Sequence, residues 1–246
     1  MGRRLDSVES LIWVAGKALT SAETRKASKS LTAAPIPPLR NEIEKELLFL
    51  NADYSNRSTY GDLSLNGVES SKEVLGTHVL PSGYRLVRAA KGDERFVIAM
   101  LHDGEGAVVY YVDCVIRRDI YLRTRPATQV TVWRSWEPQH EGAVHGIASM
   151  VFQDYLLGSY NVVVSDSCQT REGTAFWVKQ LLKAMYLGRY VYRYDLESCK
   201  LTQITDGEVV RTGAADLWGE EGKYQKVLAI ISKDHLPGDT ATGGHA

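Results

Sequence analysis

The chain has 246 residues, of which 44% are hydrophobic and 24% are charged, and its net charge is −1. This balance excludes a disordered chain, because enough apolar surface is present to form a core, and it gives no overall attraction to nucleic acid or to an anionic membrane. The three cysteines, Cys114, Cys168 and Cys199, form no C-x-x-C pair. Their number and spacing argue against a disulfide framework and indicate a reducing compartment.

The chain begins with a segment, residues 1–40, that we expect to lie outside the main domain. Apolar residues at helical spacing after Ser7 predict a short amphipathic helix, and Pro35-Ile36-Pro37-Pro38 predicts a stiff linker. Basic residues outnumber acidic ones here, which suits either an acidic partner or a solvated tail. We find neither a signal peptide nor an apolar run of roughly 20 residues that could span a membrane. We therefore expect a cytoplasmic protein.

The main domain is expected to span residues 41–236, with a Gly-rich tail at 237–246. Asn41 and Glu44 resemble a capping box and precede a helix with one apolar side. Beyond Gly83, short segments rich in Val, Tyr and Ile alternate with hairpin-type turns, which predicts an antiparallel meander. Its strands are expected at residues 84–89, 96–101, 107–115, 120–125 and 128–133.

The second half of the domain alternates helices with strands. Helices are expected at about 142–157 and 173–187, and strands at 161–164 and 190–194. This order favours right-handed crossovers and a parallel portion of sheet. A hairpin near Asp206-Gly207 and a strand at 226–232 are expected to close the domain. The predicted fold class is α/β: a mixed twisted sheet with an antiparallel first half and a parallel strand–helix–strand second half.

The connection after residues 128–133 contains Gln139-His140-Glu141-Gly142-Ala143-Val144. Glycines at a strand-to-helix connection let backbone N–H groups approach an anion, although the same pattern can simply turn the chain. Together with the order of elements over residues 84–232, this segment resembles the GNAT superfamily of acyl-CoA-dependent N-acyltransferases. The pyrophosphate loop of that family, Q/R-x-x-G-x-G/A, is matched at its first four positions and differs at Val144.

The resemblance implies acetyl-CoA or another acyl-CoA as cofactor, with its pantetheine arm between splayed strands at 130–133 and 161–165. The implied cofactor positions are Gln139, Gly142, Ala143 and Val144. The family often carries a tyrosine general acid four residues before the glycine that ends its last helix; here that place is Ala184, and Tyr186 lies two residues before Gly188. Phage-encoded Mom-type DNA-modification proteins also depart from the standard loop, and this chain is similar to them in that loose sense.

Two residues are candidates for the reaction itself. Asp166 follows the strand at 161–164, where a carboxylate could take a proton from an incoming amine. The same segment, rich in Ser, Asp and Thr, could equally cap a helix. Tyr192 belongs to a strand with alternating tyrosines, and a phenol can act as a general acid. Tyrosines in strands more often have a structural role.

Arginines between residues 117 and 134 predict a basic stripe on the sheet, which suits a nucleic-acid backbone or the phosphates of coenzyme A; solvated strand faces explain it as well. The stripe consists of Arg117, Arg118, Arg123, Arg125 and Arg134. His140 and His145 are five residues apart, which does not place them on one helical face. Nothing in the sequence brings Cys168 near either histidine, and we predict no metal site.

The function expected from the resemblance is transfer of an acyl group from an acyl-CoA to an amine. One alternative is a nucleic-acid-directed protein of the same fold, such as a phage-type DNA base modifier that uses the basic stripe and the N-terminal arm. Another is a non-catalytic binding or assembly protein. No membrane partner is expected.

Overall fold

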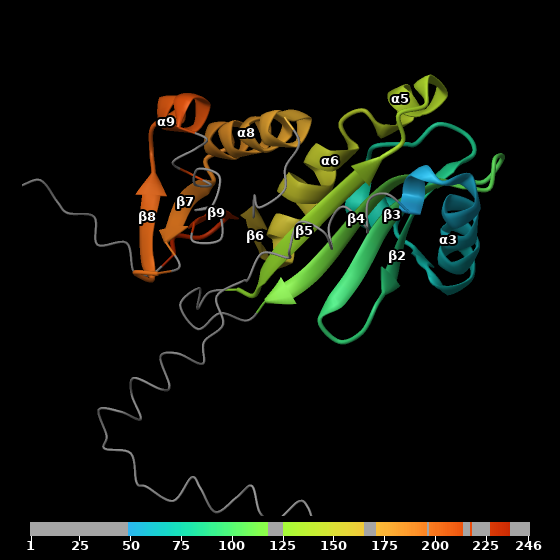
Figure 1. Cartoon of the computed structure of the whole chain (residues 1–246), viewed down its shortest axis with the longest axis horizontal. Helices are drawn as coiled ribbons and strands as arrows, with labels where there is room; N and C mark the ends of the chain where they lie inside the picture. The colour runs from blue at the N-terminus through green and yellow to red at the C-terminus, as the bar shows by residue number, and fades with distance from the viewer. Residues whose placement is uncertain are drawn as a thin grey trace, which may run out of the picture. The chain divides into compact units, whose positions relative to one another are not determined.

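The computed structural model describes residues 49–117, 125–164, 171–195, 197–213, 217 and 227–236, all within one compact unit, Ala34–Ala246. Their nine strands form a single sheet in the order β1-β2-β3-β4-β5-β6-β9-β7-β8 (Figure 1). The predicted appendage at 1–40 and the tail at 237–246 lie outside the described residues. No helix among the described residues is both long and apolar enough to cross a membrane.

The first half of the sheet is an antiparallel meander, as the alternation of apolar segments and turns predicts. It consists of β1 (Val68–Glu69), β2 (Tyr84–Ala90), β3 (Arg95–His102), β4 (Ala107–Arg117) and β5 (Ala127–Arg134). β4 and β5 pair directly from Tyr110↔Arg134 to Arg117↔Ala127. Most of the additional strand predicted at 120–125 falls outside the described residues.

The second half contains β6 (Asn161–Val164), β7 (Tyr190–Asp195), β8 (Lys200–Ile204) and β9 (Val227–Ser232). β6 is parallel to β5, but β9 lies between β6 and β7 and is antiparallel to both. β6 and β7 therefore run in the same direction without pairing. The expected parallel portion is a single pair, β5–β6, because the last strand of the domain enters the sheet where a direct β6–β7 pair was expected.

The helices expected at 142–157 and 173–187 form with different ends, whereas α3, α4 and α9 were not predicted, and most of the helix expected from Asn41 lies outside the described residues. The helix expected from residue 142 begins at Pro138 and ends at Val144; Gly146, with a φ of 78°, then interrupts it. Asp206-Gly207 starts a helix instead of a hairpin, because the Asp206 side chain caps the first turn by accepting a hydrogen bond from the Glu208 N–H at 2.8 Å. The closing hairpin joins β7 to β8. The helical segments are η2 (Phe49–Asn51), α3 (Asp53–Asn66), α4 (Ser71–Leu75), α5 (Pro138–Val144), α6 (Ile147–Ser149), the π-helical η4 (Met150–Leu156), α7 (Leu157–Ser159), α8 (Arg171–Tyr186) and α9 (Gly207–Thr212).

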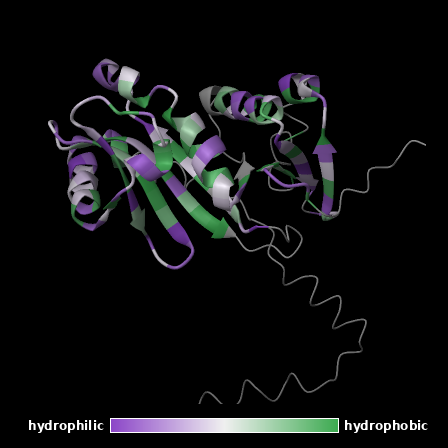
Figure 2. Cartoon of the chain, turned by 180° about the vertical axis from the view of Figure 1, so that it is seen from behind, coloured by the Kyte–Doolittle hydropathy of each residue, from purple (hydrophilic) through white to green (hydrophobic). Residues whose placement is uncertain are grey.

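Apolar side chains fill both faces of the sheet, whose central strands carry most of the hydrophobic colour in Figure 2. On one face Phe152 of η4 and Leu181 of α8 pack against the strands in the largest buried cluster. On the other face Leu63 of α3 packs against β2–β4, in a cluster that also contains Trp133 of β5. β5 therefore contributes side chains to both layers and runs between them to α5.

Candidate functional site

The described register of the parallel pair β5–β6 covers only the first residues of β5. The register joins three residues of β5 to three of β6: Ala127↔Asn161, Thr128↔Val162 and Gln129↔Val163. β5 continues to Arg134, and β4 stays paired with it over that whole length. Within the described residues, β5 has no partner strand beyond Gln129 on its β6 side. The residues that follow β6, 165–170, lie outside the described residues.

The four residues expected to bind the cofactor all lie on α5. Gln139 is exposed and its side-chain amide donates to Glu137 at 2.8 Å; Gly142 is exposed, and a Cβ built on it meets nothing within 4 Å. Ala143 and Val144 are buried. A loop was expected at this place, but Pro138 suits the first position of a helix because its φ is already helical. The N–H groups of residues 142–144 therefore lie inside the hydrogen-bonded ladder of α5.

A second helical start follows immediately. Gly146 adopts the left-handed conformation, with a φ of 78°, and precedes the continuous helical stretch α6, η4 and α7. The first N–H groups of such a stretch have no partner within the helix and attract anions. The amides of Ile147 and Ala148 are thus better placed for a phosphate than those of residues 142–144.

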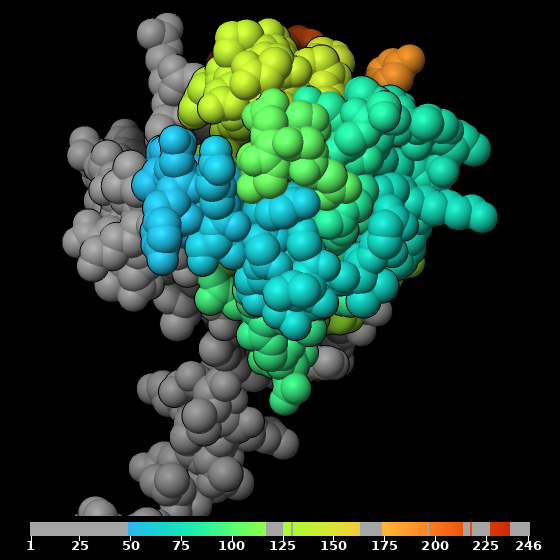
Figure 3. Space-filling model, turned by 90° about the vertical axis from the view of Figure 1, so that its right-hand side faces the viewer, coloured from blue at the N-terminus to red at the C-terminus, as the bar shows by residue number. Residues whose placement is uncertain are grey.

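An open pocket of about 680 Å³ lies beside α5, on the face where η2, α3, the β3–β4 turn and the segment before α5 meet (Figure 3). Its walls are tied together by side chains: Trp133 donates from Nε1 to Asn51 Oδ1 at 2.9 Å. Asn56 of α3 pairs with both backbone groups of Val108 on β4, at 2.8 and 2.9 Å. Three acidic side chains line the pocket together with one buried histidine: Asp53, Glu105, Glu137 and His140.

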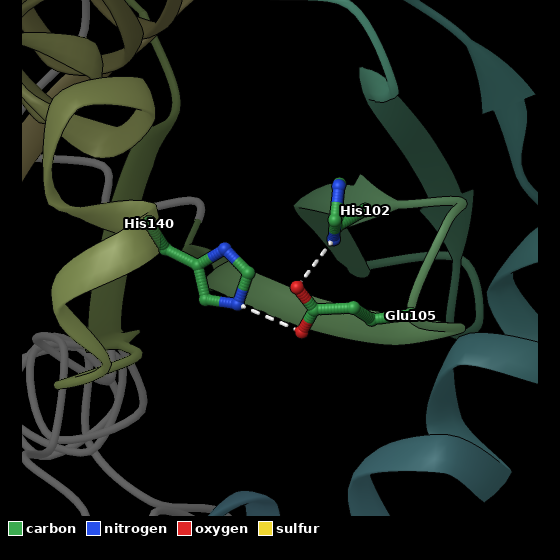
Figure 4. Close-up of side chains that lie close together, drawn as sticks. All are labelled: His102, Glu105 and His140. Carbon is green, nitrogen blue, oxygen red and sulfur yellow. Dashed lines mark ion pairs between the residues drawn. The ribbon is translucent and has the colours of Figure 1, made fainter.

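Two histidines and two glutamates converge at the edge of this pocket, and Figure 4 shows three of them: His102, Glu105 and His140. Glu105 lies between the imidazoles: its Oε1 is 3.2 Å from Nδ1 of His102, and its Oε2 is 3.4 Å from Nε2 of His140. The same His140 nitrogen is 3.2 Å from Oε2 of Glu137. His140 is only 1% exposed, whereas Glu105 and Glu137 reach the surface. His102 and Glu105 come from the β3–β4 turn, and Glu137 and His140 from the start of α5.

Tyr84 of β2 holds His140 from its other side. The hydroxyl of Tyr84 is 2.9 Å from Nδ1 of His140, and its ring stacks on His102 with centroids 4.5 Å apart. Burial raises the pKa of Tyr84, and the negative charge of Glu105 raises it further. The phenol is therefore neutral at physiological pH. It fixes the orientation of the His140 ring, with Nε2 directed at the two carboxylates.

The predicted basic stripe does not form from the side chains that the structure describes. Arg125, before β5, donates to Asp234 at 2.7 Å and to the Gly158 carbonyl at 2.5 Å, so it holds neighbouring segments together. Arg134, at the other end of β5, is exposed, and its guanidinium lies 5.1 Å from the ring of Trp136. Arg118 and Arg123 lie outside the described residues, as does the side chain of Arg117.

The two residues expected near the reacting amine have different outcomes. Asp166, like Cys168, lies outside the described residues. Tyr192 of β7 is fully buried, and its hydroxyl accepts a hydrogen bond from the Leu236 N–H at 2.9 Å. In this conformation the Tyr192 hydroxyl is a buried hydrogen-bond acceptor without access to solvent.

No known protein-family model matches the chain, and no curated protein matches it in sequence. Function therefore has to be inferred from the topology and geometry of the chain itself.

The sequence did not predict the convergence of His102, Glu105, Glu137 and His140, here called the His/Glu cluster. The histidine pair weighed as a metal site was His140 and His145. His145 is exposed and follows the last residue of α5, whereas His140 lies in the first turn of that helix. The useful signal is two short motifs with matching spacing: His102 with Glu105, and Glu137 with His140, each three residues apart. Only the fold brings the two motifs together, because 34 residues of chain, including β4 and β5, lie between Glu105 and His140.

Proposed function

We propose that this protein is an acyl-CoA-dependent N-acyltransferase of the GNAT type. The observation that carries the proposal is the order of elements: an antiparallel meander, then a helical stretch that starts at a glycine, then β6, which is parallel to the last strand of the meander, β5. We propose that an extended pantetheine arm lies beside the part of β5 that follows Gln129. The insertion of β9 between β6 and β7 is compatible with that arrangement.

The carrier would bind at the start of the helical stretch after Gly146. Its pyrophosphate would be held by the amides of Ile147 and Ala148, where the unpaired N–H groups and the helix dipole favour negative charge. Gln139 and Gly142, exposed on the preceding α5, would lie near the same phosphates. Ala143 and Val144 are buried, and we propose that they contribute by packing α5 on the sheet.

The proposed reaction is direct attack by the amine nitrogen of the acceptor on the thioester carbonyl carbon. The new C–N bond forms, the C–S bond breaks, and the thiolate of coenzyme A leaves and takes up a proton. Asp166, which follows β6 in sequence, is the proposed acceptor of the proton lost by the amine. We propose no such role for Tyr192, because its hydroxyl is inside the core.

The proposal is tested by calorimetric titration of the chain with acetyl-CoA and with free coenzyme A. Gly142→Glu adds a carboxylate at an exposed position where a Cβ meets nothing within 4 Å, so its main expected effect is on the charge near the phosphates. Repulsion at this range is expected to weaken binding by about tenfold or more. Gly142→Gln controls for size, and Gly61→Glu on α3, also free of neighbours within 4 Å, controls for charge.

Binding that is lost in Gly142→Glu and kept in both controls supports the carrier site. Absence of binding by the wild-type chain refutes the acyl-CoA proposal. Equal binding by all four proteins places the carrier somewhere other than the start of this helical stretch, which refutes the proposed site.

One exposed feature favours the second candidate, a nucleic-acid-directed protein. Trp136 is 69% exposed, and Arg134 lies over its ring at 5.1 Å. A flat aromatic surface with a cation beside it is what single-stranded nucleic acid stacks on. Binding of a single-stranded oligonucleotide that weakens steeply with salt and is lost in Trp136→Ala would favour this function. If the chain binds neither acyl-CoA nor nucleic acid, the remaining hypothesis is a non-catalytic binding or assembly protein.

A further inference from the structure

The His/Glu cluster, defined as His102, Glu105, Glu137 and His140, takes no part in the acyl transfer proposed above. One donor atom from each of His102, Glu105 and His140 lies within 4.8 Å of the other two. The contacts within the cluster measure 3.2, 3.4 and 3.2 Å between nitrogen and oxygen. Ligands of a tetrahedral zinc ion with bonds of 2.0–2.1 Å are about 3.3 Å apart. Each of these three contacts therefore has the length expected between two ligands of a tetrahedral metal site.

The charge of the cluster also favours a cation. Two carboxylates approach the same nitrogen of His140, a side chain that is 1% exposed. Among the described residues, the ionic contacts of Glu105 and Glu137 are with histidines alone. A divalent cation would neutralise both carboxylates and would leave the two imidazoles neutral, which is the form that binds metal.

Tyr84 supplies the outer contact that metal-binding histidines require. When Nε2 of His140 binds an ion, the proton of the neutral imidazole resides on Nδ1. That N–H group then needs a hydrogen-bond acceptor. The hydroxyl oxygen of Tyr84 is 2.9 Å from Nδ1 and can accept that proton. Tyr84 also stacks on His102 with centroids 4.5 Å apart, so a single side chain orients both imidazoles.

The ligands come from two segments of firmly placed backbone. His102 ends β3 and Glu105 lies in the turn to β4, and these two strands are paired along their length. Glu137 precedes α5 and His140 lies in its first turn. Glu105, Glu137 and His140 also line the pocket of about 680 Å³. An ion here would tie α5 to the β3–β4 turn at the edge of the pocket.

We propose that His102, Glu105 and His140 bind a divalent transition-metal ion of the zinc class, with Glu137 as the fourth ligand. A set of two nitrogens and carboxylate oxygens suits zinc, and cobalt as its spectroscopic substitute; calcium and magnesium prefer all-oxygen sites. The proposal is independent of the acyl transfer, because no ligand of the ion belongs to the proposed carrier site.

The test uses the full chain without an affinity tag, freed of metal by a chelator and titrated calorimetrically with Zn²⁺. Co²⁺ is titrated in parallel, because its visible spectrum reports tetrahedral coordination. The wild-type chain is expected to bind one equivalent of either ion. Glu105→Gln keeps the size of a partly exposed side chain but removes a ligand charge, and it should weaken binding by at least about tenfold. Glu141→Gln, an exposed glutamate of the same helix α5, is the matched control and should bind as the wild type does.

A second variant separates a metal site from a simple ionic cluster. Tyr84→Phe removes only the hydroxyl beside Nδ1 of His140 and leaves the stacked ring in place. It should weaken Zn²⁺ binding by about tenfold to a hundredfold without removing any ligand. Absence of stoichiometric Zn²⁺ and Co²⁺ binding by the wild type would overturn the proposal. The proposal would also be overturned if Glu105→Gln and Tyr84→Phe bound Zn²⁺ as tightly as the control Glu141→Gln, because the ion would then lie elsewhere.

Discussion

Replacement of Asn56 by alanine should detach α3 from the sheet and destabilise the wall of the pocket. The amide group of Asn56 donates to the carbonyls of Leu50 and Val108, at 3.1 and 2.9 Å, and its oxygen accepts from the Val108 N–H at 2.8 Å. The side chain thus pairs with β4 as a neighbouring strand would. Among the described residues no strand pairs with Val108 on this side, because the register of β4 with β5 ends at Tyr110↔Arg134.

The size of the effect follows from those three hydrogen bonds. Each is worth about 0.5–1.5 kcal/mol net, and Val108, which is 1% exposed, cannot turn its backbone groups to bulk water. We therefore expect Asn56→Ala to lower the free energy of unfolding by about 2–4 kcal/mol. With a denaturant dependence of about 3 kcal/mol per molar urea, the midpoint should fall by roughly 1 M.

The assay is urea unfolding followed by tryptophan fluorescence and by circular dichroism. Asn66→Ala is the matched control: it is the same residue type on the same helix, but its side chain makes an exposed contact with Asp62 Oδ1 at 2.7 Å. Its midpoint should change by the equivalent of about 0.5 kcal/mol or less. Equal midpoints for Asn56→Ala and Asn66→Ala would show that the Asn56 contacts do not hold α3 to the sheet.

Two further predictions concern backbone conformation and pH. Gly142→Ala should stabilise the chain by about 0.5–1 kcal/mol, because it improves helix propensity at a site where a Cβ has no neighbours within 4 Å. Gly146→Ala should destabilise the chain by about 1–2 kcal/mol, because alanine is strained at a φ of 78°. Thermal unfolding measures both, and shifts of the same sign would contradict the prediction. Hydrogen bonding from the Ser198 N–H lowers the pKa of Asp195 below its ordinary value of 3.8. Its stabilisation is therefore complete above that pH and is lost as the pH falls through the lowered pKa. The free energy of unfolding of the wild type should accordingly fall more steeply below pH 4 than that of Asp195→Asn, and parallel curves in urea unfolding would exclude this role.

Local patterns were enough to predict β2, β3, β4 and β5 of the meander, but not the helices α3 and α4 that precede them. Alternating apolar residues and glycine-containing turns specify β2, β3 and β4, since each hairpin is settled by residues close together in the chain. Helix ends were predicted less well. Pro138 starts α5 four residues early, and Asp206 caps α9 where a turn was expected, because Pro and Asp-Gly suit both a turn and the start of a helix.

The candidate site could be predicted only in part. The strand-to-helix connection after β5 was located from its glycines, yet the amides available to an anion follow Gly146 and not Gly142. The convergence of His102, Glu105 and His140 was not foreseen. Each of these residues looks ordinary in its own segment, and no helical or strand period relates one motif to the other.

Sequence alone determined the α/β class, the antiparallel first half and the apolar segments that form the core, because these depend on the period of neighbouring residues. Tertiary structure decided which strands became neighbours: β9 entered between β6 and β7, and β5 became the parallel partner of β6. It also decided which side chains met across the sheet. Strand order and side-chain convergence depend on how separate surfaces pack together, and that information is spread over the whole chain.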